Sequence, residues 1–225
     1  PIFHQSIKNN INRRVELPII FINIGGISNA TYFYNHNETE NKMFAGDIGP
    51  GNCLIDEWIR NNSKFNFDKG GKIAQSGKIN QLILNQAIEN FEIKNYSKSL
   101  DIKDFDTSFA RGLSLEDGCS TITNFTAKLI SDAIKYLNKK NFSKNYLLCG
   151  GGRKNDFLIK CITQNLQNEN LNIDKIEKYD LDGDFIESRA FGYLAIRSFL
   201  NLPISFKKTT GCNSPTVGGK IIKNY

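Results

Sequence analysis

The sequence is poor in the residues from which metal centres and disulfide frameworks are built. Its 225 residues include two histidines and five cysteines, and no cysteine pair has the CxxC spacing of a zinc or redox site. An odd number of unpatterned cysteines also argues against an extracellular disulfide scaffold. The chain lacks both an apolar run near the roughly 20 residues that span a bilayer and a signal-peptide pattern. We therefore expect no protein-held metal, no membrane partner and a reducing, cytoplasmic location.

Clustered positive charge is missing too, although Lys and Arg outnumber Asp and Glu by 29 to 23 and give a net charge of +6. The paired cations Arg13-Arg14, Lys139-Lys140 and Lys207-Lys208 lie far apart in the chain, and Lys dominates over Arg. A surface that binds nucleic acid concentrates its cations on one face and favours Arg. We therefore do not expect nucleic acid as a partner.

The residues that are abundant predict a folded α/β domain. Hydrophobic residues make up 40% of the chain, which is enough for a core. Three strands in a meander, followed by alternating helices and strands, is the order of the ribonuclease-H-like unit, so we expect a mixed five-stranded sheet with helices on both faces. Ser114 is the expected N-cap of the longest helix. The expected elements are strands at 17–24, 30–34 and 42–46, a helix at 53–60, an insertion at about 61–112 with a helix at 81–91, a helix at 115–137, a strand at 146–149, a helix at 155–167, a strand at 173–179 and a helix at 184–200.

Two glycines follow the first predicted strand. Bare backbone N–H groups at Gly25 and Gly26 can bind an anion, and Ser28 and Asn29 can add side-chain donors. A plain hairpin turn requires the same residues. The pattern therefore leaves phosphate binding and a structural turn both open.

Two carboxylates stand where predicted elements begin or end. Asp47 follows a buried strand and precedes a Gly-Pro-Gly-Asn turn. There it can act as a general base, hold a metal–nucleotide complex or cap the next helix. Glu187, in the first turn of the last long helix, can share that site, or it can be favoured there by the helix dipole alone. Asp56, on the helix at 53–60, is expected to position the loop rather than react.

A run of three glycines, Gly150-Gly151-Gly152, ends a buried strand and opens a helix. Backbone at such a position can lie against the base, ribose or phosphate of a nucleotide. A tight turn explains the run equally well. Arg153 and Asn155 follow at the start of the helix, and either can touch a nucleotide.

Together these motifs resemble one known family, anhydro-N-acetylmuramic acid kinase. The likeness covers nearly the whole chain in the family's own order. It implies membership of the actin-like ATPase and sugar kinase superfamily, whose two ribonuclease-H-like lobes enclose ATP. The segments that carry it are 23–29, 47–52 with 54–58, 98–101, 148–152 with Asn155, and 182–194 with 209–211.

The resemblance implies a kinase of cell-wall recycling that uses ATP and Mg²⁺. In that reaction water opens the anhydro ring of the sugar, and the freed hydroxyl takes the γ-phosphoryl group to give N-acetylmuramic acid 6-phosphate. By motif, Asp47 is the general base and Glu187 lies in the same site. A homodimer is also implied. The implied nucleotide contacts are Gly25, Gly26, Ser28, Asn29, Gly150, Gly151, Gly152 and Asn155, and the implied sugar contacts are Asn52, Lys98 and Ser99.

The sequence departs from the family at its start. Family members begin with another lobe that carries a Gly- and Ser-rich phosphate loop, and these residues contain no such segment. We therefore expect residues 1–225 to form the C-terminal lobe alone, with the N-terminal lobe as a missing partner and with little turnover by itself. Two alternatives stay open. One is a non-catalytic actin-like module that binds nucleotide or a protein, and the other is an RNA-processing enzyme with Asp47, Asp56 and Glu187 as metal ligands.

Overall fold

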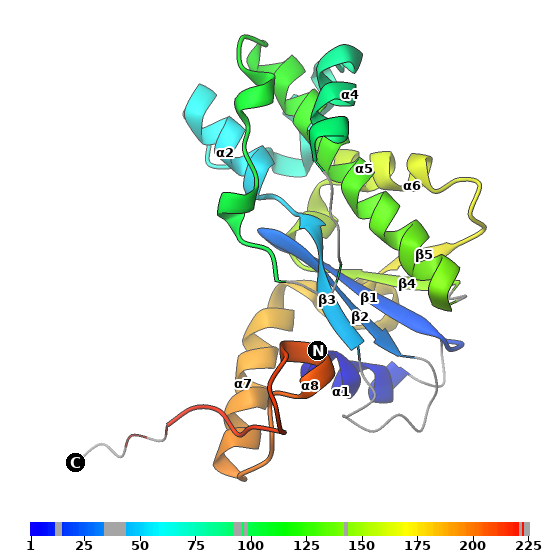
Figure 1. The fold of residues 1–225 in the computed structure, drawn as a ribbon, viewed down its shortest axis with the longest axis vertical. Coiled ribbons are helices and arrows are strands. Elements are labelled where there is room, and N and C mark those ends of the chain that lie inside the picture. Colours follow the sequence, from blue (N-terminus) through cyan, green and yellow to red (C-terminus); the bar gives the residue numbers. More distant parts are fainter. Residues whose placement is uncertain are drawn as a thin grey trace.

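The structure, a computed structural model, describes residues 1–11, 15–33, 44–91, 96, 99–141, 144–220 and 222. Lys98, and the loop predicted between the second and third strands with the strand ends beside it, lie outside these residues. Within the described chain a five-stranded sheet forms the centre of the molecule, with strand order β3-β2-β1-β4-β5 (Figure 1). This is the predicted ribonuclease-H-like order.

The sheet combines an antiparallel meander with two parallel strands. β1 pairs antiparallel with β2, and β2 pairs antiparallel with β3, whereas β1–β4 and β4–β5 are parallel. The central strand β1 is therefore the place where the sheet changes from antiparallel to parallel. The strand bounds are Ile19–Ile24 (β1), Ile27–Phe33 (β2), Phe44–Pro50 (β3), Asn145–Cys149 (β4) and Asn172–Lys175 (β5).

Helices cover both faces of the sheet because the central strands are apolar on both sides. Ile20, Ile22 and Ile24 of β1 pack into one core, whereas Ile19 and Phe21 pack into the other. The first core lies under α2, α5 and α6, and the second lies under α1 and α7 (Figure 1). The helix bounds are Ile2–Ile11 (α1), Cys53–Asn62 (α2), Lys72–Ser76 (α3), Gln81–Asn90 (α4), Leu115–Asn141 (α5), Asp156–Asn165 (α6), Ile186–Phe199 (α7) and Lys207–Thr210 (α8).

Several predicted boundaries are wrong. The residues predicted as a turn at 27–29 belong to β2, and β3 continues through Asp47 to Pro50. The reason is a strand pairing with a bulge between Ser28 and Asn29, in which the buried Ser28 hydroxyl donates to the Pro50 carbonyl over 3.1 Å. The strand predicted at 173–179 ends at Lys175 and passes into a 3-10 helix, Ile176–Tyr179.

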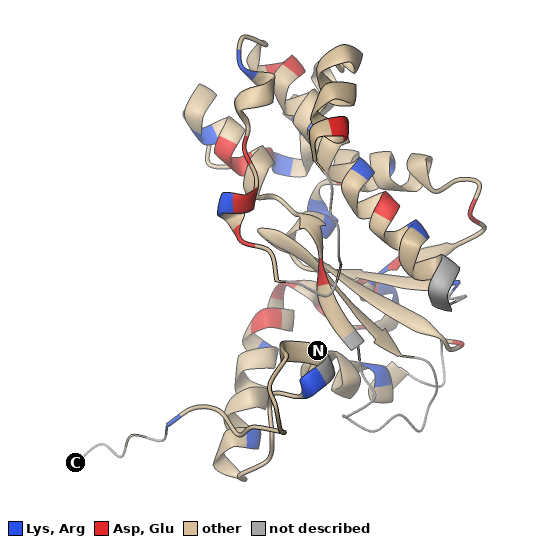
Figure 2. Ribbon diagram, in the orientation of Figure 1, with Lys and Arg blue, Asp and Glu red and all other residues tan. Residues whose placement is uncertain are grey.

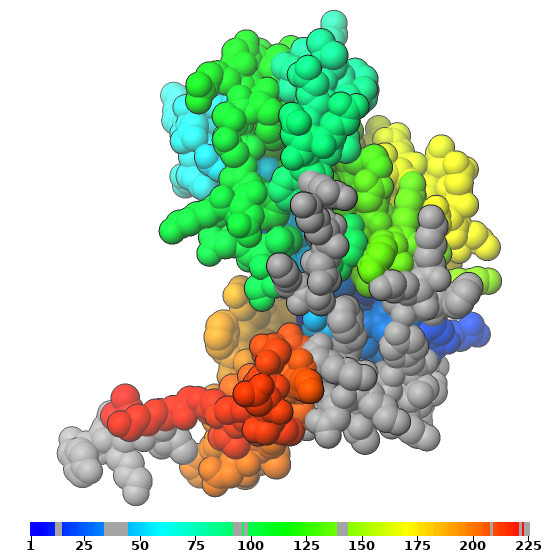
Figure 3. Space-filling view, in the orientation of Figure 1, coloured from blue at the N-terminus to red at the C-terminus, as the bar shows by residue number. Residues whose placement is uncertain are grey.

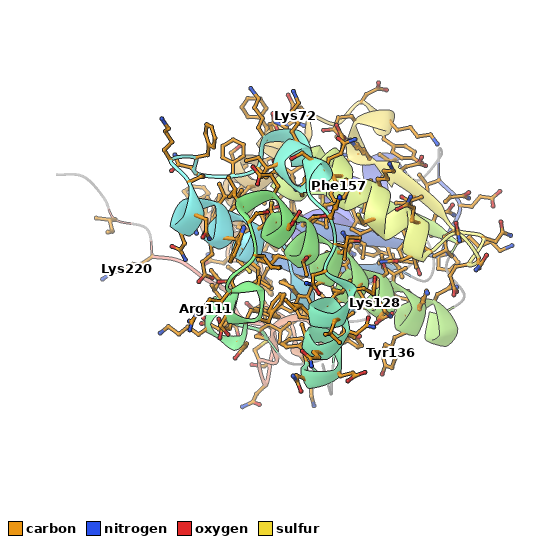
Figure 4. The ribbon with its side chains drawn as sticks, turned by 90° about the horizontal axis from the view of Figure 1, so that it is seen from above. Lys72, Arg111, Lys128, Tyr136, Phe157 and Lys220 are labelled. Atoms are coloured by element: carbon orange, nitrogen blue, oxygen red, sulfur yellow. The ribbon has the colours of Figure 1, made fainter. Side chains whose placement is uncertain are left out.

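The predicted insertion packs along the first half of α5. Asp68 anchors it, because its two carboxylate oxygens accept from the backbone N–H groups of Ile73 and Ala74 at 2.9 and 3.0 Å. Figure 4 looks down on this region, with Lys72 and Arg111 on separate sides of it. Short 3-10 turns connect the helices of the insertion at Lys69–Gly71, Ile102–Asp104 and Ser108–Ala110.

Two further features of the fold concern the helices and the cysteines. Across the described ranges, none of the helices is long and apolar enough to cross a membrane. All five cysteines are free, and four of them are buried. Burial raises the pKa of the Cys149 thiol to about 12, so this thiol is held in its protonated form.

Candidate active site

Two glycine turns lie side by side at the same edge of the sheet. β1 and β4 are parallel neighbours with Asn23 opposite Cys149, so the turns that follow them meet beyond the strand ends. Gly150 has a φ of +79°, and a Cβ added there would lie 2.6 Å from the Ile24 carbonyl oxygen. A Cβ on Gly152 would lie 2.2 Å from the Ile24 side chain. These two glycines are therefore required by the close approach of the turn to β1.

A cleft of about 760 Å³ opens beside these turns. It lies at the carboxyl ends of parallel strands, where open α/β sheets bind their ligands. Figure 2 shows acidic positions where the chain enters α7, next to the sheet. Six of the predicted site residues line the cleft, namely Gly25, Gly26, Asn29, Gly150, Gly151 and Glu187.

Gly26 and Gly151 differ from the other glycines of the cleft. A Cβ added at Gly26 would meet no atom within 4 Å, and one at Gly151 would meet only the Asn52 amide at 3.9 Å. Neither residue has a positive φ. Packing among the described residues therefore does not require glycine at these two positions, and a side chain there would occupy the cleft itself.

The peptide groups of the first turn are oriented by a third turn, at Gly51-Asn52. The N–H groups of Gly51 and Asn52 donate to the carbonyls of Gly26 and Gly25, both over 2.8 Å. Because a trans peptide points its N–H and C=O in opposite directions, the N–H groups of Gly26 and Ile27 point away from this contact. Backbone N–H groups that point outward in this way are typical of an anion-binding turn.

Ser28 and Asn155 lie in the predicted region but use their side chains within the protein. Ser28 is fully buried and donates to the Pro50 carbonyl. Asn155 is buried too, and its Oδ1 caps α6 by accepting from the Leu158 N–H over 3.0 Å. Their polar atoms therefore hold the strand pair and the helix start that carry the cleft.

Asp47 lies on β3 next to a residue that lines the cleft. It pairs with Asn29 of β2, and Asn29 lines the cleft. Its Oδ2 accepts from the backbone N–H of Leu100 over 2.8 Å, so the segment that contains the exposed Ser99 lies against this carboxylate. The structure therefore brings together Asp47 and the loop that the sequence assigns to the sugar.

Arg153 has a role that the sequence did not reveal. It is 3% exposed, and its guanidinium donates to Glu177, to Asp184 and to the Gly150 carbonyl at 2.6, 2.7 and 3.0 Å. A Cβ on Gly183 would lie 2.2 Å from this guanidinium. Arg153 therefore fixes the triple-glycine turn against the start of α7. The sequence shows the arginine and the acidic residues, but it does not show that Arg153 is buried between them.

A second, smaller cleft of about 260 Å³ adjoins the first and shares Gly151 with it. Burial raises the pKa of Asp56, which lines this cleft, to about 6, and the nearby Asp68 adds to the shift. The other lining residues are Asn52, Phe67, Asp68, Gly70, Lys154 and Asn155.

The three carboxylates of the RNA-processing hypothesis occupy different places. Glu187 lines the large cleft, Asp56 lines the small one, and Asp47 is held by Leu100 beside β2. Among the described residues no group of three His, Cys, Asp or Glu is placed to hold a metal ion. The geometry therefore does not favour a two-metal centre built from these carboxylates.

The sheet order and the glycine-lined cleft at its strand ends define an α/β lobe of the ribonuclease-H-like class. The chain belongs to the anhydro-N-acetylmuramic acid kinase family, whose sequence pattern it matches over residues 1–224.

Three relatives carry the name anhydro-N-acetylmuramic acid kinase. The chain is 47% identical to the protein of Pelagibacter ubique (strain HTCC1062), over 100% of this chain and 60% of that protein. It is 34% identical to the proteins of Brucella canis (97% of this chain, 57% of that protein) and Agrobacterium fabrum (99% and 58%). The chain thus spans about three fifths of the length of the curated relatives it matches.

Among solved structures, the activator of the 2-hydroxyisocaproyl-CoA dehydratase from Clostridium difficile, with bound ADPNP, shows a distant likeness. The TM-score is 0.47 at 14% identity, over 77% of this chain and 59% of that one. This likeness is too weak to bear on the site.

Proposed function

We propose that the chain is the nucleotide-binding lobe of an ATP-dependent kinase that acts on anhydro-N-acetylmuramic acid. The family and its named relatives support this reaction class. The observation that carries the proposal is the pair of glycines, Gly26 and Gly151, that line the cleft without any packing reason to be glycine. Bare backbone on two sides of a cleft suits a ligand that lies flat against it, as a nucleotide does.

In this proposal each of the two glycine turns binds a different part of the nucleotide. Gly25 and Gly26, with the outward N–H groups of their turn, approach the phosphates, and Gly150 to Gly152 contact the nucleoside side. Ser28 and Asn155 support these turns from below through the hydrogen bonds described above. Glu187 would hold Mg²⁺ when it is bound, because the other carboxylate of the cleft, Asp184, is already paired with Arg153 and Lys154. The ion would supply positive charge that neutralises the phosphates.

Asp47 would act as the general base. Leu100 holds one of its oxygens, which fixes the carboxylate and leaves the other oxygen to accept a proton. Asp47 would take a proton from water as the water oxygen bonds to the anomeric carbon and the anhydro C–O bond breaks. The primary oxygen keeps the electron pair of the broken C–O bond and attacks the γ-phosphorus as the bond to ADP breaks, which gives N-acetylmuramic acid 6-phosphate and ADP, and Asp47 then releases its proton to solvent. Asn52, Lys98 and Ser99 would contact the sugar.

In this proposal the reaction takes place in the cytoplasm as a step of cell-wall recycling. Residues 1–225 form one side of the active site. Phosphoryl transfer requires the phosphates and the metal to be held from both sides. We propose that the remaining length of the relatives supplies the other side, so that residues 1–225 alone bind nucleotide weakly.

A turnover assay tests the proposal. The chain is incubated with ATP, Mg²⁺ and anhydro-N-acetylmuramic acid, alone and joined to the part of the Pelagibacter relative that the chain does not cover, and ADP and the phosphorylated sugar are measured. We expect both products from the joined protein and little from the chain alone. ADP release without phosphorylated sugar from the joined protein would contradict the assigned substrate.

A further inference from the structure

The small cleft contains an acidic side chain that the chain itself leaves without a partner. Asp56 lies on α2, about half-buried, and its carboxylate makes no hydrogen bond or ion pair with any described residue. A half-buried carboxylate normally recovers its lost hydration through hydrogen bonds. Asp56 therefore has acceptor capacity directed at whatever enters the cleft.

Three other polar side chains that line this cleft already have partners. Asp68 binds two backbone N–H groups of the insertion, Lys154 pairs with Asp184, and the Asn155 side chain caps α6. Arg60, one turn further along α2, acts on Asp56 through charge alone and lowers its pKa against the larger effect of burial. Asp56 is thus the charged acceptor in this cleft that remains available to a ligand, next to the Asn52 amide, which does not cap α2.

The two clefts are joined at Gly151, which lines both. A nucleotide with its phosphates in the large cleft would cross Gly151 and place its sugar in the small one. Phe67, whose ring is 56% exposed at the edge of the small cleft, offers a flat apolar surface beyond it. The two joined clefts therefore present an anion-binding turn, bare backbone, a carboxylate and an aromatic ring, which are groups that suit the phosphates, ribose and base of a nucleotide.

We propose that Asp56 determines nucleotide specificity by accepting hydrogen bonds from the ribose hydroxyls. An ionised carboxylate accepts only and has two oxygens, and the ribose diol supplies two donors, so the groups are complementary. This inference rests on the proposed function. The hydroxyls of the sugar substrate have the same chemistry, so the test must separate the two sources.

The protonation state of Asp56 provides a second signature. The groups that face it are Arg60 on its own helix, Asp68 of the insertion, Lys154 beside the glycine turn and the buried Cys119 thiol of α5. The pKa of Asp56 lies at about 6 in the unliganded chain, so the carboxylate is ionised at pH 7.5 and largely protonated at pH 5. Affinity for a ribonucleotide should therefore fall as the pH is lowered through 6.

Calorimetric titration of the 225-residue chain tests the inference. A non-hydrolysable ATP analogue and its 2′-deoxy form are titrated to millimolar concentration against the wild type, Asp56→Asn, and the control Glu89→Gln on the exposed side of α4. We expect the wild type and the control to prefer the ribonucleotide by about tenfold. Asp56→Asn should bind the ribonucleotide about tenfold more weakly at pH 7.5. It should show no preference between the two analogues at either pH 7.5 or pH 5.

Three outcomes overturn the inference. If Asp56→Asn retains the wild-type affinity and preference, Asp56 does not contact the ribose. If Asp56→Asn loses affinity for anhydro-N-acetylmuramic acid and not for the nucleotide, the hydroxyls belong to the sugar substrate. If the wild type binds no nucleotide at all, the proposed function falls together with this inference, which distinguishes that failure from the first two.

Discussion

At the scale of single residues, the glycines of the cleft separate into two kinds. Gly150 and Gly152 have glycine imposed on them by the nearness of Ile24, whereas Gly26 and Gly151 face open space. From the sequence alone, a tight turn and a nucleotide contact explain Gly150 to Gly152 equally well. The structure assigns the turn to the outer glycines and leaves the middle one available for a ligand, a distinction that depends on tertiary contacts with β1.

The two kinds of glycine predict opposite results for the same substitution. Gly151→Ala adds a methyl group to the cleft, so nucleotide affinity should fall about tenfold while the free energy of unfolding changes by less than about 1 kcal/mol. Gly152→Ala forces a methyl group into Ile24 and should cost about 1–3 kcal/mol. Chemical denaturation and calorimetric titration measure the two effects. Equal destabilisation by both substitutions would contradict this assignment.

Asp47→Asn tests the general base. The asparagine Oδ1 can still accept from the Leu100 N–H, so the loop should stay in place and ATP affinity should be nearly unchanged. Turnover of the active enzyme should fall by roughly a hundredfold or more. Steady-state kinetics at saturating ATP measures this, and wild-type turnover would place the base elsewhere.

The Asp56 carboxylate is predicted to lower the stability of the fold. Its pKa in the folded state is about 6, above the ordinary value of 3.8, so the free energy of unfolding decreases as the pH rises from about 4 to 6. This loss of stability persists above pH 6. Asp56→Asn should therefore raise Tm by about 2–4 °C at pH 7.5. At pH 4 the two proteins should melt together. A lower Tm for the variant at pH 7.5 would show that the carboxylate supports the fold.

At the scale of elements, α1 was absent from the sequence prediction. Its buried residues Ile2, Ile7 and Ile11 do mark an amphipathic face, but that face becomes a helix only by packing under the sheet. The helix at 115–137 was predicted, with its cap, because the pattern is long and local: the Ser114 hydroxyl accepts from the Asp117 N–H over 3.1 Å. The sequence predicts a helix that depends on local patterns, but not one that depends on tertiary packing.

His4 connects α1 to the sheet and should make its docking sensitive to pH. Its Nδ1 lies 2.7 Å from the Thr31 hydroxyl, and its ring stacks on Phe21. Burial lowers the pKa of His4 well below 6.5, so the stability this group contributes is present above pH 6.5 and is lost as the pH falls below it. Measured in the Asp56→Asn background, stability should drop between pH 6.5 and 5. His4→Gln should flatten that slope, and an unchanged slope would assign it to other groups.

At the scale of the whole molecule, α7 carries exposed apolar side chains. Figure 3 shows the orange segment that contains α7 at the surface, away from the cyan-to-green region that contains the insertion. Phe191 and Phe199 of α7 are 67% and 69% exposed. Large exposed apolar patches favour association. The sequence predicted a dimer only through its family, because exposure of these side chains depends on the packing of α7.

We predict that the chain self-associates through α7. Light scattering should show a dimer at about 100 µM that the double substitution of Phe191 and Phe199 to Ser converts to a monomer. Substituting Phe65 and Phe67 to Ser is the control, because both rings are 56% exposed but lie in the insertion. A wild-type monomer at this concentration would contradict the prediction.

We expect a nucleotide to bind across the two glycine turns. A crystal structure of the chain with a non-hydrolysable ATP analogue and Mg²⁺ would show this binding mode. We expect the phosphates beside Gly25 and Gly26 and the nucleoside against Gly150 to Gly152. Density for the nucleotide in the separate phenylalanine-lined pocket between α4 and α5, with the glycine cleft empty, would contradict it.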